Sequence, residues 1–137
     1  INSRITELQA SFLNFKLKKI NDFIKIRKKI AQHYLLKLKN TKFKLPELKN
    51  NVFNSFVVQH VERDKIIKKL IKKKIFLNIN YPFPIHKMKS YKKYVCKNCN
   101  CLKNTELISK RIFSLPIYNN LSFKKINFVI KSLIKES

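Results

Sequence analysis

Three cysteines have the spacing that most directly suggests chemistry. Cys96, Cys99 and Cys101 lie close together, and thiolates at this spacing can share a tetrahedral zinc ion, with His86 as a fourth ligand. A zinc ribbon has a second cysteine pair, which this sequence lacks, and reduced thiols in a cytosolic loop are the alternative. We therefore expect no metal site, and the odd number of cysteines predicts no disulfide framework.

The other side chains capable of catalysis form no recognisable constellation. The three histidines are His33, His60 and His86, and only seven residues are acidic, which leaves few carboxylates for paired acid–base work. Glycine is absent, so no glycine-rich loop can cradle a phosphate. His86 follows the rigid Pro82-Phe83-Pro84 turn, where a side chain can be held toward a site. These residues alone predict no enzyme.

The charge of the chain is extreme but carries little functional information. Its 137 residues include 32 basic and 7 acidic ones, which gives a net charge of +25. All but four of the basic residues are lysines spread along the whole chain, whereas specific nucleic-acid contacts favour arginine. An A/T-rich genome produces such a composition whatever the protein does. We expect salt-sensitive sticking to polyanions and no specific nucleic-acid binding.

The start of the chain and its short apolar runs predict location and context. Ile1-Asn2-Ser3-Arg4 does not resemble a secretory leader, and no apolar run is long enough to span a membrane. We expect a cytoplasmic protein without membrane contact. Because the sequence does not begin with Met, it is expected to be part of a longer chain.

Helical periodicity dominates both ends of the sequence. Residues 6–39 place apolar residues at helical spacing, which predicts two helices, or one bent helix, with Asn21-Asp22 as the second start. Thr6-Glu7-Leu8-Gln9 has the spacing of a capping box, and Ser3 is an equally good candidate cap. Arg63-Asp64 is expected to cap a short helix, and another helix should run from Thr105 to about Phe113. Ser122 should cap the last helix. The apolar faces of the 63–71 and 122–134 helices are expected to be buried: Ile66, Ile67, Leu70 and Ile71, and Ile126, Val129, Ile130, Leu133 and Ile134.

β-Branched and aromatic residues predict short strands between these helices. We expect strands at 52–61 and 75–79, a brief extended piece at 115–118, a loop at 40–51 and irregular chain at 86–103. The strands are too few and too short for a doubly wound sheet. The predicted fold class is α+β, with a small, mostly antiparallel sheet covered by helices.

Four motifs, in order, resemble the DegT/DnrJ/StrS-type sugar aminotransferases, which are PLP-dependent enzymes of fold type I. Asn2-Ser3-Arg4-Ile5-Thr6-Glu7-Leu8-Gln9-Ala10 resembles their N-x-R-x-x-E-L-Q-A segment, and Arg63-Asp64 resembles the R-D that opens the small-domain helix. Residues 81–86 resemble H-Y-P-x-P-x-H, and residues 104–118 resemble N-T-E…S-L-P-M-Y. The resemblance covers essentially the whole chain. It implies that residues 1–137 form the C-terminal small domain, with the PLP-binding large domain upstream.

The resemblance also implies roles for individual residues. Asn2 would reach across a homodimer interface to the PLP phosphate, with Arg4 beside the same interface. Tyr81 and His86 would edge the pocket for a nucleotide-sugar substrate. The whole enzyme would pass an amino group, with glutamate as the expected donor, to a keto sugar for surface-glycan synthesis.

The departures from the family pattern are equally specific. Asn80 stands where the family usually has the first His of H-Y-P, and Asn54 where many members have a His before a strand. No lysine here lies in the context of the family's Schiff-base lysine, so this chain alone cannot transaminate. Two other functions therefore remain open beside the domain of a working enzyme. One is a catalytically inactive, free-standing remnant, and the other is a basic nucleic-acid-binding protein.

Overall fold

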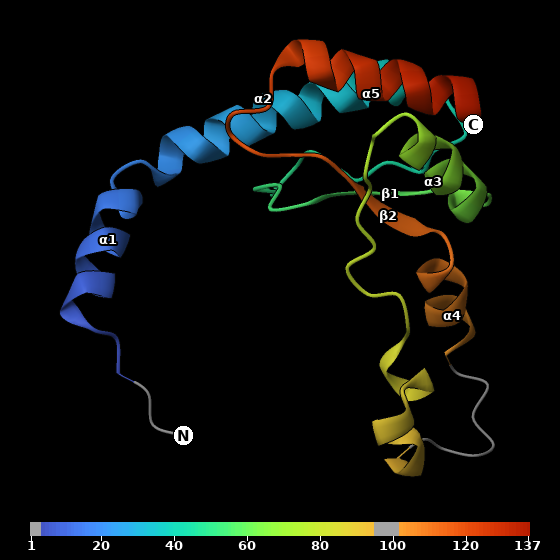
Figure 1. The fold of residues 1–137 in the computed structure, drawn as a ribbon, viewed down its shortest axis with the longest axis horizontal. Coiled ribbons are helices and arrows are strands. Elements are labelled where there is room, and N and C mark those ends of the chain that lie inside the picture. The colour runs from blue at the N-terminus through green and yellow to red at the C-terminus, as the bar shows by residue number, and fades with distance from the viewer. Residues whose placement is uncertain (1–3, 95–101) are drawn as a thin grey trace.

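The longest element of the computed structural model, which describes residues 4–94 and 102–137, is helix α2 (Ile20–Leu38). Its buried residues Ile30, Tyr34 and Leu38 recur every four positions and so lie on one face. A short turn separates α2 from helix α1 (Glu7–Leu17), which buries none of its residues. Figure 1 shows α1 extending away from the other elements.

The capping box predicted at the start of α1 is confirmed. Thr6 Oγ1 accepts a hydrogen bond from the Gln9 backbone N–H at 3.3 Å, and Gln9 Oε1 accepts one from the Thr6 N–H at 3.1 Å. The prediction of two helices is also confirmed, although α2 begins at Ile20 rather than at Asn21. The helix start signals thus lie in the local sequence.

A two-stranded antiparallel sheet packs against α2, with the ring centroids of Phe56 and Tyr34 5.1 Å apart, and this arrangement confirms the predicted fold class. Strand β1 (Phe56–Gln59) pairs with β2 (Ile112–Leu115), with Phe56 opposite Leu115 and Gln59 opposite Ile112. Isolated bridges add Lys44 beside Gln59 and Asn78 beside Ser114. Three segments that are distant in sequence therefore meet at Ser114.

One predicted strand and one predicted helix end are wrong. The segment 75–79 forms only the Asn78 bridge, because Ile75 still bonds the Leu70 carbonyl at the end of α3 and prolines follow at 82 and 84. Helix α4 (Lys103–Ser109) ends four residues before Phe113, so β2 starts at Ile112. Pro116 then lacks the N–H that would continue the ladder.

The strand predicted at 52–61 shortens to 56–59, and the segment 85–94 forms the 3₁₀ helices η1 (Ile85–Lys87) and η2 (Lys89–Tyr94).

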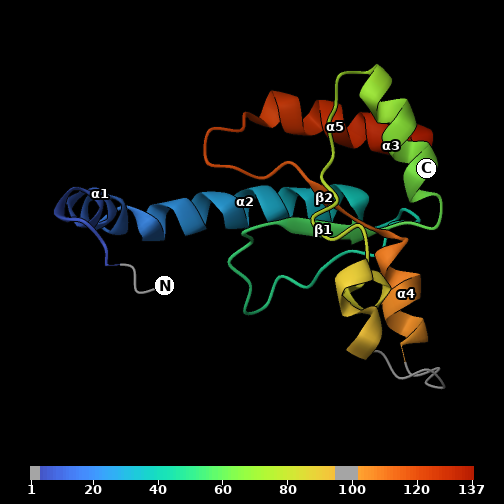
Figure 2. The same ribbon diagram turned by 60° about the horizontal axis from the view of Figure 1, so that its bottom comes forward.

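Helices α2, α3 (Arg63–Lys72) and α5 (Phe123–Glu136) enclose the core with the sheet (Figures 1 and 2). Tyr34 lies in its centre and donates a hydrogen bond from its hydroxyl to the Pro116 carbonyl at 3.0 Å. Ser122 caps α5 as predicted, with its Oγ accepting from the Lys125 N–H. The prediction that Ile71 and Ile134 are buried is wrong, because both lie on outer helix faces and are 46% exposed.

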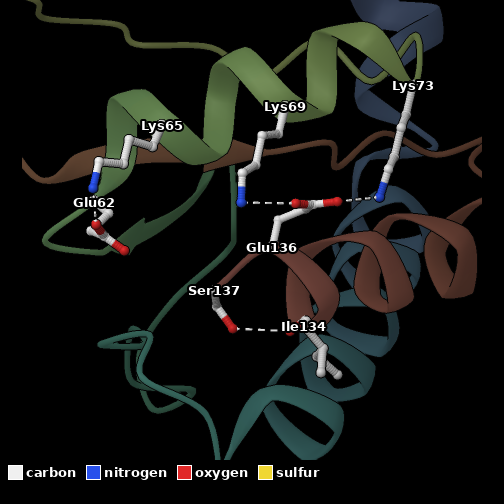
Figure 3. Close-up of polar contacts among 7 residues, drawn as sticks. All are labelled: Glu62, Lys65, Lys69, Lys73, Ile134, Glu136 and Ser137. Atoms are coloured by element: carbon white, nitrogen blue, oxygen red, sulfur yellow. Dashed lines mark hydrogen bonds and ion pairs between the residues drawn. The ribbon is translucent and has the colours of Figure 1, made fainter.

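The end of α5 is tied to α3 by ion pairs (Figure 3). Glu136 accepts hydrogen-bonded ion pairs from Lys73 Nζ at 2.6 Å and Lys69 Nζ at 3.1 Å. The side chain of Glu136 is only 14% exposed, in contrast to the half-exposed Glu62, which pairs with Lys65 at the start of α3. No helix within the described ranges has the length and apolar character needed to cross a membrane.

The stabilisation that the Glu136 carboxylate provides should depend on pH in a defined direction. The hydrogen bonds from Lys73 and Lys69 hold the pKa of Glu136 below its usual value. A lowered folded-state pKa stabilises the fold above the unfolded-state pKa, and this contribution is lost as the pH falls through the folded-state pKa. Glu136→Gln should therefore lower the melting temperature at pH 7, and the difference should shrink as the pH is lowered from 5 to 3.

Thermal unfolding of the wild type and of the Glu136→Gln variant, followed by circular dichroism at pH 7 and at pH 3, measures this effect. Glu62→Gln is the matched control, because its ion pair lies within one helix and in solvent, where such pairs contribute little. An equal loss at pH 7 and pH 3 would show that Glu136 stabilises the fold by packing and not by charge.

Candidate functional site

The predicted substrate residue His86 lies in a charged hydrogen-bonded group. Its Nε2 is 2.9 Å from Glu106 Oε1 on α4, and its side chain is 14% exposed. Lys87 Nζ reaches the same carboxylate oxygen at 3.0 Å. The hydrogen bonds from His86 and Lys87 hold the pKa of Glu106 below its usual value, so this carboxylate stays ionised and fixes the imidazole ring.

Sequence reasoning gave Glu106 no role. Two features of the sequence could have pointed to Glu106: it stands in the N-T-E motif, and it is one of only seven acidic residues. Its partner lies 20 positions away in the chain, so the spacing of the two residues did not reveal the contact.

The second predicted substrate residue, Tyr81, is highly exposed and lines a different surface. It borders a hollow of about 240 Å³ together with Phe83, Pro84, Thr105 and Ile108. His86 is not among the lining residues, because its ring turns toward Glu106. Tyr81 and His86 therefore flank the same turn, but they do not share one hollow.

Of the two predicted cofactor residues, Arg4 is the one that the structure describes, and it lies near the N-terminal end of the described chain. Arg4 is exposed and precedes α1, whereas Asn2 falls outside the described residues. We call residues 4–17, which include Arg4 and α1, the N-terminal arm. In Figures 1 and 2 this arm stands apart from the 3₁₀ helices that follow Tyr81. The N-terminal arm and the Tyr81–His86 turn are thus separate parts of this chain.

The remaining histidines have structural surroundings. His33 Nε2 is 2.7 Å from Asn127 Oδ1, which links α2 to α5. His60 is buried and accepts a hydrogen bond at Nδ1 from the Glu62 N–H at 3.0 Å, and burial lowers the pKa of His60. Neither ring borders a hollow described above.

The predicted absence of a metal site stays a prediction. Cys96, Cys99 and Cys101 all lie outside the described residues. Within residues 4–94 and 102–137, no three His, Cys, Asp or Glu side chains come together in an arrangement that could hold a metal ion.

A second polar surface is formed by amide side chains. Residues Asn54, Asn78 and Asn80 border a hollow of about 270 Å³ next to the Asn78–Ser114 bridge. Sequence reasoning marked Asn54 and Asn80 only as departures from a family pattern.

Comparison with known proteins gives consistent matches in sequence and structure. Residues 1–134 match the DegT/DnrJ/EryC1/StrS aminotransferase family. A dTDP-3-amino-3,6-dideoxy-alpha-D-galactopyranose transaminase of Aneurinibacillus thermoaerophilus is 33% identical over 136 residues, which are 97% of this chain and 37% of that protein. A dTDP-3-amino-3,4,6-trideoxy-alpha-D-glucose transaminase of Micromonospora megalomicea subsp. nigra is 34% identical over 140 residues, with 96% and 37% covered.

Solved structures show the same fold. The DesV protein of S. venezuelae, in complex with a ketimine intermediate, matches with a TM-score of 0.91 and 26% identity over 98% of this chain and 37% of that chain. A DegT DnrJ EryC1 StrS aminotransferase from Brucella abortus matches with a TM-score of 0.87 and 31% identity over 97% and 36%. The chain thus spans little more than a third of the length of these relatives.

Proposed function

Because this chain belongs to the DegT/DnrJ/EryC1/StrS aminotransferase family, we propose that it is the C-terminal small domain of a PLP-dependent enzyme that aminates a keto nucleotide-sugar. Glutamate is the proposed amino donor, surface-glycan synthesis the proposed pathway class, and the cytoplasm the proposed location. The observation that carries the proposal is the match along residues 1–134, together with relatives whose names describe nucleotide-sugar transaminases.

Helix α1 supports the view that this chain is one part of a larger protein. A helix of 11 residues is only marginally stable in water by itself, and α1 has no buried residue to stabilise it. Its apolar side chains, among them Leu8, Phe12 and Phe15, are largely exposed. A large domain upstream would supply the missing contact surface.

The proposed cofactor is pyridoxal phosphate, held in the full-length enzyme with help from Asn2 and Arg4. The exposed guanidinium of Arg4 suits a phosphate dianion, and its position on the extended arm suits a group bound outside this chain's own core. The Asn2 amide would donate a hydrogen bond to the same phosphate. When bound, the cofactor supplies the electron sink for amino-group transfer.

The separation of the arm from the Tyr81–His86 turn supports a homodimer with a shared site. If the arm and the turn of one chain serve different pockets, then each pocket needs the arm of the partner subunit. This arrangement would place Asn2 and Arg4 of one protomer beside the cofactor of the other.

His86 and Tyr81 are proposed to bind the substrate. Glu106 accepts the Nε2–H of His86, so Nδ1 of the neutral ring remains to accept a hydrogen bond from a hydroxyl group. The exposed ring of Tyr81 offers an aromatic surface to the same ligand. These contacts bind and orient the substrate, and the proton-transferring lysine belongs to the large domain.

The absorbance spectrum of the full-length gene product tests the proposed function. We expect a protein much larger than 16.4 kDa with a cofactor band that shifts on addition of glutamate. A gene product near 16.4 kDa without such a band would instead favour the inactive remnant.

Asn2→Ala tests the proposed phosphate contact in that enzyme. Loss of one hydrogen bond to a charged phosphate should weaken PLP binding about tenfold or more. The measurement is the dissociation constant for PLP in the intact dimer. Asn14→Ala, an exposed amide on the same arm, is the control and should retain the wild-type constant. Unchanged PLP affinity in Asn2→Ala would remove Asn2 from the site.

A further inference from the structure

The hollow beside the Asn78–Ser114 bridge is built by three segments of the chain. Asn54 and Ser55 precede β1, residues 76–80 follow α3, and Ser114 belongs to β2. The Ser114 N–H donates to the Asn78 carbonyl at 2.8 Å, and the Asn78 N–H donates to the Ser114 carbonyl at 3.4 Å. The backbone thus holds the walls of the hollow in a fixed register.

The chemistry of its lining differs from the rest of the surface. The chain carries 32 basic residues, yet none of the described residues that line this hollow is charged. Three asparagine amides and two serine hydroxyls supply hydrogen-bonding groups that do not titrate. Phe76 adds a side chain that is 73% exposed. Such a surface suits a neutral ligand with hydroxyl groups and an apolar ring face.

The amides are held in defined orientations. Asn78 Nδ2 donates to Asn80 Oδ1, so the pair presents Asn78 Oδ1 as an acceptor and Asn80 Nδ2 as a donor. Arg27 Nη1 donates to Asn54 Oδ1 at 3.3 Å and to the Asn54 carbonyl at 3.2 Å, which leaves Asn54 Nδ2 as a second donor. Preorganised donors and acceptors reduce the entropy lost when a ligand binds.

The turn that carries Asn54 is specifically supported. Phe53 has a positive φ of 52°, an uncommon conformation for a bulky residue, and its side chain is fully buried. Arg27 Nη1 also bonds the Phe53 carbonyl at 3.3 Å, and Asn51 Oδ1 accepts from the Phe53 N–H at 2.9 Å. The structure therefore keeps an unfavourable backbone conformation at the residue next to Asn54.

We infer that this hollow, termed here the amide hollow, binds the neutral sugar ring of the nucleotide-sugar, with Asn54, Asn78 and Asn80 on its hydroxyl groups and Phe76 against its apolar face. The inference rests on the proposed function and names the residues of this chain that would distinguish a sugar from its bare nucleotide. Asn54 and Asn80, the two departures from the family pattern noted in the sequence, both border the hollow. Sugar recognition here therefore requires no protonated group.

The affinity for a nucleotide-sugar, compared with the affinity for its nucleoside diphosphate, separates the contacts to the sugar ring from the contacts to the diphosphate. The probes are dTDP-glucose with dTDP and UDP-glucose with UDP, titrated calorimetrically into the full-length holoenzyme. The double variant Asn78→Ala/Asn80→Ala should weaken binding of the nucleotide-sugar at least tenfold and leave the nucleoside diphosphate unchanged, since each lost hydrogen bond to the ring weakens binding several-fold. Asn40→Ala, an exposed amide beyond the end of α2, is the matched control and should change neither.

A pH series gives a second readout. The affinity gained from the sugar should be flat between pH 6 and pH 8 in the wild type and pH-dependent in Asn80→His, because only the variant has a titrating group in the hollow. An equal loss for the nucleotide-sugar and the nucleotide, or no loss for either, would overturn the inference. A wild-type enzyme that shows the cofactor band but gains no affinity from the sugar would overturn it too. A protein with neither the band nor nucleotide binding would refute the proposed function itself.

Discussion

Arg63→Met is expected to lower the free energy of unfolding by about 3 kcal/mol, because it removes the hydrogen bonds from a nearly buried guanidinium to two part-buried backbone carbonyls. Arg63 Nη1 donates to the Ser109 carbonyl at 2.5 Å and to the Ile112 carbonyl at 3.4 Å. The arginine side chain is nearly buried, so water cannot replace the lost donors without opening the structure. The variant leaves the end of α4 and the start of β2 without their link to α3.

Chemical denaturation of the 137-residue chain measures this loss. Lys68→Met on the same helix is the matched control, since Lys68 is exposed and surface substitutions usually change stability by less than about 0.5 kcal/mol. Asp64→Asn should also have a small effect, because Asp64 is exposed although it accepts from Arg63 Nε at 2.8 Å. If Arg63→Met and Lys68→Met were equally stable, the two carbonyl contacts would contribute nothing to folding.

Replacement of Leu8, Phe12 and Phe15 by glutamine should abolish self-association of the isolated chain but destabilise the full-length enzyme. In the isolated chain these side chains are exposed, so the wild type should self-associate and the triple variant should be monomeric with an unchanged melting temperature. In the full-length enzyme the proposed large domain covers α1. Burial of three such side chains contributes about 5 kcal/mol, so the variant should there be markedly less stable.

Sedimentation velocity over a range of concentrations measures the first effect, and thermal unfolding of the full-length enzyme measures the second. Asn14→Gln, on the same helix but outside the hollow that Leu8, Phe12 and Phe15 line, is the control for the substitution itself and should leave the self-association intact. A full-length triple variant as stable as the wild type would show that α1 remains uncovered there, and the proposed domain arrangement would be wrong.

The sequence predicted the features of the fold that depend on local contacts. The capping box at Thr6 and the Ser122 cap involve partners three residues away, and both were found as predicted. The strand predicted at 75–79 failed because strand formation depends on partners distant in sequence, and only Asn78 meets one, at Ser114. The burial of Ile134 was overestimated because an apolar residue in a periodic stretch need not face the core.

The same distinction applies to the candidate site. The motif spacing pointed to His86 and Tyr81, but not to the contact between His86 and Glu106, which requires α4 to pack beside η1. The amide hollow was unpredictable for the same reason, since Asn54 and Ser114 meet only through strand pairing. Individual asparagines carry no sequence signal that separates a binding role from an ordinary turn.

The small sheet is also protected against pairing with another molecule. Beyond the β1–β2 ladder, Gln59 exchanges both backbone hydrogen bonds with Lys44, Ser114 bonds to Asn78, and Arg63 covers the Ile112 carbonyl. Within the described residues, both outer edges of the sheet are thus partly occupied, so an incoming strand meets a shorter row of unpaired donors and acceptors. A chain separated from its proposed large domain should therefore associate through reversible helical contacts and resist conversion into cross-β aggregates.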